Sequence, residues 1–376
     1  MNTFQDSFEL FTSKSDPLFT IVEAFEPGRL RQARVLARLK KSELANLIGV
    51  SAAAVGQFEA GITTPKAEHI LPLARALQVE PSFFTAGRPL HPIDTASAHF
   101  RSLRSVRAAD RDQALATVEQ AWELAHALEK RIQFPEINLP DLSEGASPAL
   151  AARILREHWN IREGPLPHLV ATMEANGIIT LILEAGSIDR VDAFSTWGAE
   201  RPIVISTPRC SNNVYRHRFT CAHELGHLLL HEEAIPGDPT QEREADEFAA
   251  ALLTPITEIR HVLPSRVDFA ALARIGQDWG VSLDSLIRRM QELGFVSDSS
   301  VRRTFQRLNA NPHLRADEPW AAYPGETPSL LKQALDICQN IGVSLVELAE
   351  ELKWKPSRIR ELVGIDDPRP QLSLVN

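Results

Sequence analysis

The chain is poor in cysteine, and its few cysteines are poorly placed for cross-linking. Its 376 residues contain three, Cys210, Cys221 and Cys338, which are odd in number and far apart. This pattern argues against a disulfide framework and favours a reducing compartment. No CxxC pair occurs, so a zinc site built only from thiolates is excluded.

Long apolar runs and an excess of positive charge are also missing. The longest apolar runs, such as 178–183, are far too short to cross a bilayer. The first 18 residues include Asp6 and Glu9 and lack a basic leader before an apolar core, so we expect no signal peptide and a cytoplasmic protein. The formal net charge of -9 gives no global attraction to nucleic acid. Any contact with nucleic acid must therefore come from a local patch.

Length and hydrophobic pattern predict several domains in a mostly helical α+β fold. We expect an N-terminal five-helix bundle, then a domain with a small β-sheet, then a helical C-terminal region. The strands are predicted near 178–183, 191–194 and 203–205. The predicted domain boundaries are an arm at 1–25, a helical domain at 26–87, a linker with a long helix at 88–148, the α+β domain at 149–262 and the C-terminal region at 263–376.

A zinc-binding pattern lies in the run His223-Glu224-Leu225-Gly226-His227. Residues four apart project from one face of a helix, so His223 and His227 can bind a single ion. Glu224 lies one position further round the helix. From there it can hydrogen-bond a water on the metal and serve as general base.

A second predicted helix, 241–253, supplies the carboxylates that a catalytic zinc site needs. Glu242 and Asp246 share a face, so one can bind zinc while the other accepts the remaining ring N–H of a ligand histidine. Glu244 points elsewhere, and we rank it below Glu242 as third ligand. The alternative is that these acids form a solvated helix face. We expect His231 to be a surface residue that complements the helix dipole, and Cys221 to be a packed thiol.

The run RFTCAHELGHLLLH at 218–231, followed by ExxADxFAAxLLxP at 242–255, resembles the ImmA/IrrE family of bacterial zinc metallopeptidases. The resemblance spans about 150–260. It implies a gluzincin-like site with His223, His227 and Glu242 as ligands. It also implies a regulatory protease whose substrates are helix-turn-helix repressors. No oxyanion-stabilising residue can be assigned, although Tyr215 and His217 are candidates.

The segment 26–86 is locally basic, with 8 Lys/Arg against 5 Asp/Glu. Within it, LANLIGVSAAAVGQFEAGITTP at 44–65 resembles the XRE (Cro/CI-type) helix-turn-helix family. In that geometry the second helix enters the major groove of DNA. Ala52, Ala53 and Ala54 replace the polar side chains that relatives often carry there. Ser51 and Gln57 are left as the expected base readers. The expected phosphate contacts are Lys40, Lys41, Arg29 and Arg31.

Together these patterns predict a DNA-binding regulator fused to a zinc metallo-endopeptidase that cleaves a repressor, an antitoxin-like protein or itself. A homodimer is a further expectation, because helix-turn-helix domains often pair on two-fold DNA sites. The alternative is a transcription factor whose peptidase-like domain senses a ligand or metal and cleaves nothing. Two later segments, 280–289 and 343–360, have a similar helix-turn-helix pattern. We expect both to pack against the peptidase domain.

Overall fold

The structure is a computed structural model. It describes residues 17–93, 98–100, 107–143, 145–182, 193–197, 201–207, 213–231, 235, 238–315 and 323–365; the prediction of an arm at 1–25 therefore lies largely outside the described residues, as do Asp6, Glu9 and Cys210. The chain divides into two compact units, Met1–Leu90 and His91–Asn376. Each unit is described by itself.

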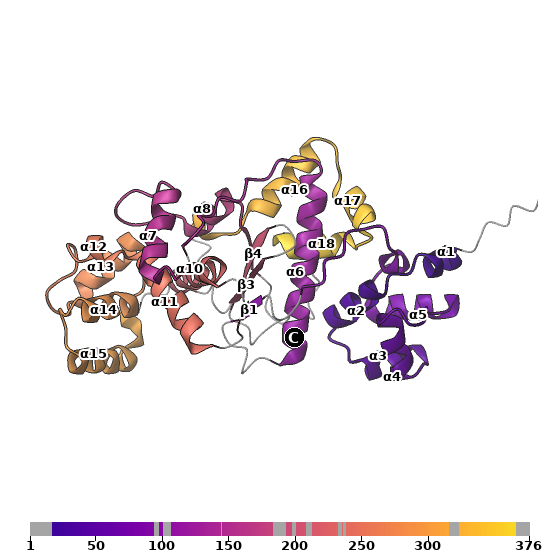
Figure 1. Cartoon of the computed structure of the whole chain (residues 1–376), viewed down its shortest axis with the longest axis horizontal. Coiled ribbons are helices and arrows are strands. Elements are labelled where there is room, and N and C mark those ends of the chain that lie inside the picture. The colour runs from indigo at the N-terminus through magenta and orange to yellow at the C-terminus, as the bar shows by residue number, and fades with distance from the viewer. Residues whose placement is uncertain are drawn as a thin grey trace, which may run out of the picture. The chain divides into compact units, whose positions relative to one another are not determined.

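The first unit is a bundle of short helices (Figure 1). Its elements are α1 (Pro17–Glu23), α2 (Pro27–Leu36), α3 (Lys41–Ile48), α4 (Ala52–Glu59), α5 (Ala67–Leu77) and the 3-10 helix η1 (Pro81–Phe84). Gly49 ends α3 in the left-handed conformation at φ 73°, which a glycine adopts without strain. Ser51 then caps α4, its Oγ accepting the Ala54 N–H at 3.1 Å. Leu44 and Val55, both fully buried, pack these two helices together.

A four-stranded sheet lies in the second unit, in the order β1-β3-β4-β2. Its strands are β1 (Ala98–Phe100), β2 (Ile179–Ile182), β3 (Ala193–Trp197) and β4 (Pro202–Ser206). β2 runs parallel to β4, and the other two pairs are antiparallel. The last three strands overlap the predicted ones, and β3 extends three residues beyond its predicted end at 194. β1 was not predicted, because three residues within a segment that looked like a linker give no periodic signal.

The mostly helical α+β class is confirmed (Figure 1). The helices up to residue 259 of this unit are α6 (Ala108–Glu129), α7 (Pro148–His158), α8 (Leu169–Ala175), α10 (Val214–Leu230), α11 (Pro239–Leu253) and α12 (Ile256–Ile259). Of these, α8 packs on β2, and α10 packs on β3 and β4. α10 and α11 are in close contact. A Cβ on Gly226 would come within 2.9 Å of the Phe248 ring, so the glycine permits this approach.

The chain continues through α13 (Phe269–Trp279), α14 (Leu283–Glu292), α15 (Asp298–Ala310), η3 (Pro312–Leu314) and η5 (Pro324–Glu326). It then forms α16 (Leu330–Asn340), α17 (Leu345–Leu352) and α18 (Pro356–Val363). α14 buries Leu286 and Met290 in the same apolar core as α10 and α11. α16 and α17 pack on α6, and Arg358 of α18 donates to Gln120 at 2.7 Å. Both segments with a helix-turn-helix pattern therefore pack within this unit.

Candidate active site and DNA-binding surface

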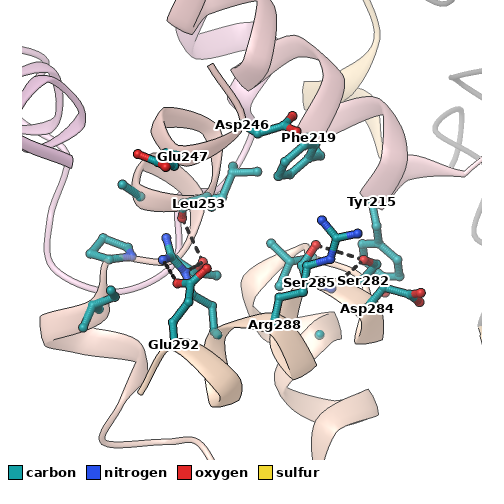
Figure 2. A pocket seen from close by; sticks show the side chains of 18 of the residues that line it. Tyr215, Phe219, Asp246, Glu247, Leu253, Ser282, Asp284, Ser285, Arg288 and Glu292 are labelled. Atoms are coloured by element: carbon teal, nitrogen blue, oxygen red, sulfur yellow. Dashed lines mark hydrogen bonds and ion pairs between the residues drawn. The ribbon is translucent and has the colours of Figure 1, made fainter. Parts of the chain in front are cut away.

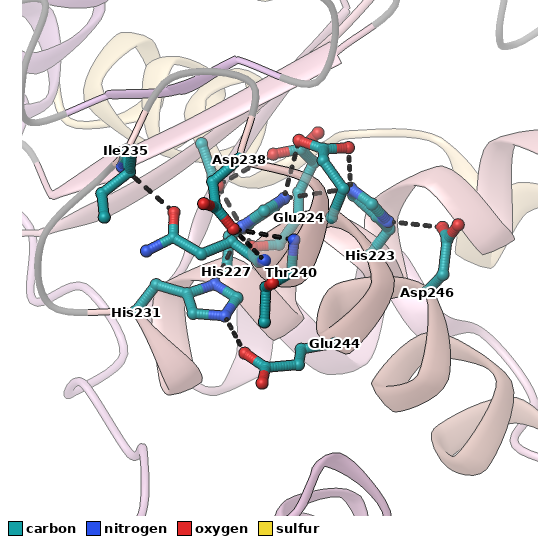
Figure 3. Close-up of polar contacts among 12 residues, drawn as sticks. His223, Glu224, His227, His231, Ile235, Asp238, Thr240, Glu244 and Asp246 are labelled. Carbon is teal, nitrogen blue, oxygen red and sulfur yellow. Dashed lines mark hydrogen bonds and ion pairs between the residues drawn. The ribbon is translucent and has the colours of Figure 1, made fainter. Parts of the chain in front are cut away.

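Two histidines and one glutamate meet where α10 and α11 face each other. His223 and His227 are buried, and their Nε2 atoms lie 3.0 Å apart (Figure 3). Glu242 reaches both, with Oε2 at 3.6 Å from His223 Nε2 and Oε1 at 3.7 Å from His227 Nε2. One ligand atom from each of the three lies within 4.8 Å of the others. The structure thus brings together the three residues predicted as metal ligands.

The spacing of these donors suits a zinc ion. Zn–N and Zn–O bonds of about 2.0–2.1 Å in a tetrahedron place neighbouring donor atoms about 3.3 Å apart. The three separations of 3.0, 3.6 and 3.7 Å lie on either side of that value. Two imidazoles and one carboxylate are also a known donor set of catalytic zinc, which leaves a fourth position for water or substrate. The residues present therefore fit zinc.

The other ring nitrogen of each histidine has a partner of its own. His223 Nδ1 lies 2.8 Å from Asp246 Oδ1, the contact expected from the spacing of the second helix (Figure 3). His227 Nδ1 lies 3.0 Å from His231 Nδ1, and His231 Nε2 lies 3.1 Å from Glu244 Oε2. These contacts hold both imidazole rings so that Nε2 of each faces the metal position.

His231 was expected at the surface, and this expectation was wrong. The residue is 8% exposed and packs against His227. It lies four residues after His227, so it continues the same helix face and is covered when α11 folds back. Glu244, which the sequence placed away from the site, contacts it from α11.

Glu224 is fully buried beside this group. Its Oε2 accepts a hydrogen bond from Ser195 Oγ at 2.8 Å, and Ser195 is itself fully buried on β3. Nothing in the sequence indicates this contact, because a single serine within a short strand looks like any other strand residue. Tertiary packing of α10 on β3 creates the contact.

Local capping fixes where both helices begin. Asn213 Oδ1 accepts the N–H groups of Tyr215 and Arg216 at the start of α10. Asp238 Oδ1 accepts those of Gln241, at 3.0 Å, and Thr240, at 2.7 Å, at the start of α11. These donors lower the pKa of the Asp238 carboxyl.

The two candidates for oxyanion stabilisation have other surroundings. His217 is 1% exposed, its Nε2 lies 3.1 Å from the backbone carbonyl of Glu326, and its ring contacts the buried Cys221 thiol. Burial lowers the pKa of His217. Tyr215 is buried and lines a cavity bounded by α14. Cys221 is a packed thiol at 2% exposure.

In the first unit, four of the six predicted DNA contacts are exposed. Ser51, Gln57, Lys40 and Lys41 are exposed around α3 and α4. Lys41 Nζ also pairs with Glu59 at 3.3 Å, and Arg31 is half-buried.

Arg29 does not lie where a phosphate can reach it, and its prediction as a phosphate contact was wrong. Its side chain is 1% exposed, and its guanidinium donates to Gln32 Oε1 at 3.0 Å and to the Pro89 carbonyl at 2.7 Å. Arg29 therefore holds the end of this unit to α2. The sequence does not distinguish a buried arginine from an exposed one here, because either can lie in the first turn of a helix with an apolar face.

Comparison with known families finds a match within each unit. Residues 30–84 match the helix-turn-helix family, and residues 178–291 match a peptidase family described as the IrrE N-terminal-like domain. No curated protein matches the chain significantly. Among the described residues, no helix is long and apolar enough to span a membrane. The chain therefore carries a helix-turn-helix DNA-binding domain and an IrrE-like peptidase domain in one polypeptide, the fusion that its motifs predicted.

Proposed function

We propose that this protein is a DNA-binding regulator whose peptidase domain is a zinc-dependent endopeptidase. The observation that carries the proposal is the grouping of His223, His227 and Glu242 at zinc-like spacing, with the buried carboxylate of Glu224 next to them on α10. A domain that only sensed a metal would need the three ligands and would have no use for a general base.

The arrangement of these side chains suggests a role for each of them. His223, His227 and Glu242 would hold the ion, and Asp246 and His231 would keep the two rings oriented. Zinc bound there would lower the pKa of a coordinated water towards neutrality and polarise the scissile carbonyl. Glu224 would take the proton from the attacking water and deliver it to the leaving amine. The Ser195 hydroxyl, which donates to Glu224, fixes the direction of the carboxylate during this transfer.

The substrate that we propose is a regulatory protein, a helix-turn-helix repressor or an antitoxin-like partner. The physical link is the covalent fusion with a DNA-binding domain, which places the peptidase where such proteins act. DNA would be contacted by the exposed N-terminal end of α4. Ser51 Oγ accepts a backbone N–H, which leaves its hydroxyl proton for a base edge. Gln57, Lys40 and Lys41 would contribute further polar and phosphate contacts, and a homodimer would present two such ends.

The test compares wild type with Glu224→Gln, each co-expressed with helix-turn-helix proteins encoded beside it. Gln keeps the shape of the side chain and removes the base. We expect zinc-dependent cleavage by wild type only. Glu350→Gln, on the exposed face of α17, is the matched control and should cleave like wild type. Absence of cleavage by wild type, with DNA binding unaffected by Glu224→Gln, would support the sensor function and refute the peptidase.

A further inference from the structure

A cavity of about 1700 Å³ lies in the second unit, and Figure 2 shows some of the side chains that line it. Its walls come from α7, the first half of α10, α11 and α14. Asp246, which holds His223 Nδ1, is one of the lining residues. His223, His227 and Glu242 themselves are not. The cavity is therefore next to the site at Asp246, the residue that contacts His223 Nδ1, and this ring nitrogen faces away from the metal position.

Most arginines that line the cavity are neutralised by a carboxylate of the protein. The pairs are Arg153–Glu157, Arg156–Glu258, Arg243–Glu247, Arg289–Glu292 and Arg315–Asp284. Arg288 on α14 differs, because it has no hydrogen bond or ion pair with any residue that the structure describes. Figure 2 shows its side chain reaching from α14 towards Phe219 on α10. Arg288 is exposed, and its charge at the cavity has no carboxylate partner among the described residues.

The next residue, Arg289, carries a buried donor that has no acceptor among the described residues. Its side chain is 7% exposed. Nε donates to Thr254 Oγ1 at 3.0 Å, and Nη1 donates to Glu292 Oε2 at 2.5 Å. Nη2 is buried and has no acceptor within the described part of the chain. Buried guanidinium N–H groups in proteins are almost always hydrogen-bonded, so an acceptor from outside the chain is expected here.

Apolar side chains also line this cavity. Phe219, Leu253 and Leu283 line the cavity together with the ring of Tyr215. A site with cationic donors on one wall and apolar surface beside them suits an organic anion, which has a carboxylate or phosphate group and an apolar body.

We propose that this cavity binds a small organic anion, whose carboxylate or phosphate is received by Arg289 and Arg288, and that the bound anion acts on the metal centre through Asp246. The ligand would touch the residue that orients His223, and it would not occupy the position of the scissile peptide. The effect on the metal centre rests on the proposed function, whereas the binding of the anion does not.

Binding is tested on the full-length metal-free protein by isothermal titration calorimetry. Benzoate and inorganic phosphate are the anionic probes, and benzamide has the shape of benzoate without its charge. We expect millimolar binding of benzoate and at least ten-fold weaker binding of benzamide. A stronger response to phosphate than to benzoate would indicate a phosphorylated ligand.

The variants Arg288→Gln and Arg289→Lys locate the site. Arg289→Lys keeps the charge and removes the whole guanidinium, so Nη2 is lost together with the donors to Thr254 and Glu292. Each variant should weaken benzoate or phosphate binding about ten-fold. Arg302→Gln, an exposed arginine of α15 outside the cavity, is the matched control and should bind like wild type. Equal affinity for benzoate and benzamide without phosphate binding, or anion affinity that both cavity variants leave unchanged, would overturn the proposal.

The coupling to the metal centre is measured as zinc affinity with and without saturating benzoate. We expect the zinc dissociation constant of wild type to change at least three-fold, and that of Arg289→Lys to stay constant at the same benzoate concentration. This measurement needs no peptidase activity, so a protein that cleaves nothing can still pass it. A zinc affinity that benzoate leaves unchanged in wild type would refute the coupling.

Discussion

Replacing Glu242 by alanine should remove most of the zinc affinity of the peptidase domain. Glu242 reaches both histidine Nε2 atoms, at 3.6 and 3.7 Å. Structural zinc sites with four ligands bind at about 10–16 kcal/mol, so one ligand contributes about 3 kcal/mol, or about two orders of magnitude in Kd. We expect a loss of about 100-fold or more for Glu242→Ala.

Two neighbouring carboxylates provide a graded comparison. Asp246 contacts a ligand histidine directly, and loss of such a contact typically weakens metal binding about 10–100-fold. Glu244 contacts His231, and His231 in turn contacts the ligand His227. Because it is one residue further from the ion, Glu244→Ala should weaken binding less than about ten-fold. The expected order of zinc loss is Glu242→Ala, then Asp246→Ala, then Glu244→Ala.

The assay is competition for zinc with a chromophoric chelator at pH 7, with far-UV circular dichroism to verify that each variant is folded. A Glu244→Ala variant that loses as much zinc affinity as Glu242→Ala would refute the assignment of the third ligand. It would mean that α11 turns a different face to the histidines.

Other perturbations test the packing, the general base and the first unit. Ser195→Ala should lower kcat about ten-fold with little change in KM or zinc affinity, since it removes the hydroxyl that orients the Glu224 carboxylate. An unchanged kcat would show that Ser195 does not position Glu224. Gly226→Val should destabilise the protein by about 1–3 kcal/mol in urea unfolding, because its Cβ would meet the Phe248 ring. Burial lowers the pKa of His217, so its contribution to stability is present above about pH 6.5 and is lost as pH falls below that value, by up to about 1.4 kcal/mol per pH unit. The free energy of unfolding of His217→Gln should therefore vary less than that of wild type between pH 7.5 and 5.5. Equal slopes of this free energy against pH would contradict the expectation. Arg29→Met should lower stability by about 1.5–3 kcal/mol, whereas Lys40→Ala should leave stability unchanged and reduce the salt dependence of duplex DNA binding by about 0.9 in log–log slope.

Much of the candidate site could be predicted from sequence because it depends on spacing within one helix. His223, Glu224 and His227 keep their relation wherever α10 packs, since helical geometry fixes it. The same reasoning placed Glu242 and Asp246 on one face of α11. The order of helices and the start of α4 at Ser51 followed equally from local signals.

Contacts between distant segments were beyond such reasoning. The burial of His231, the hydrogen bond from Ser195 to Glu224 and the three-residue strand β1 depend on how α10, α11 and the sheet meet. Arg29 is the clearest case, because its residue type indicated a phosphate contact and its burial against Pro89 shows a structural role.

The sequence by itself determined the helix-turn-helix pattern and the HExxH helix with its acidic partner helix, because these are encoded over a few consecutive turns. Only the tertiary structure decided which nitrogen of each histidine faces the metal position and which arginines are paired. It also decided that one cavity is lined both by Asp246 and by Arg289, whose Nη2 has no acceptor among the described residues. The physical reason is that burial and hydrogen-bond partners are properties of packed surfaces, and residues far apart in the chain make those surfaces.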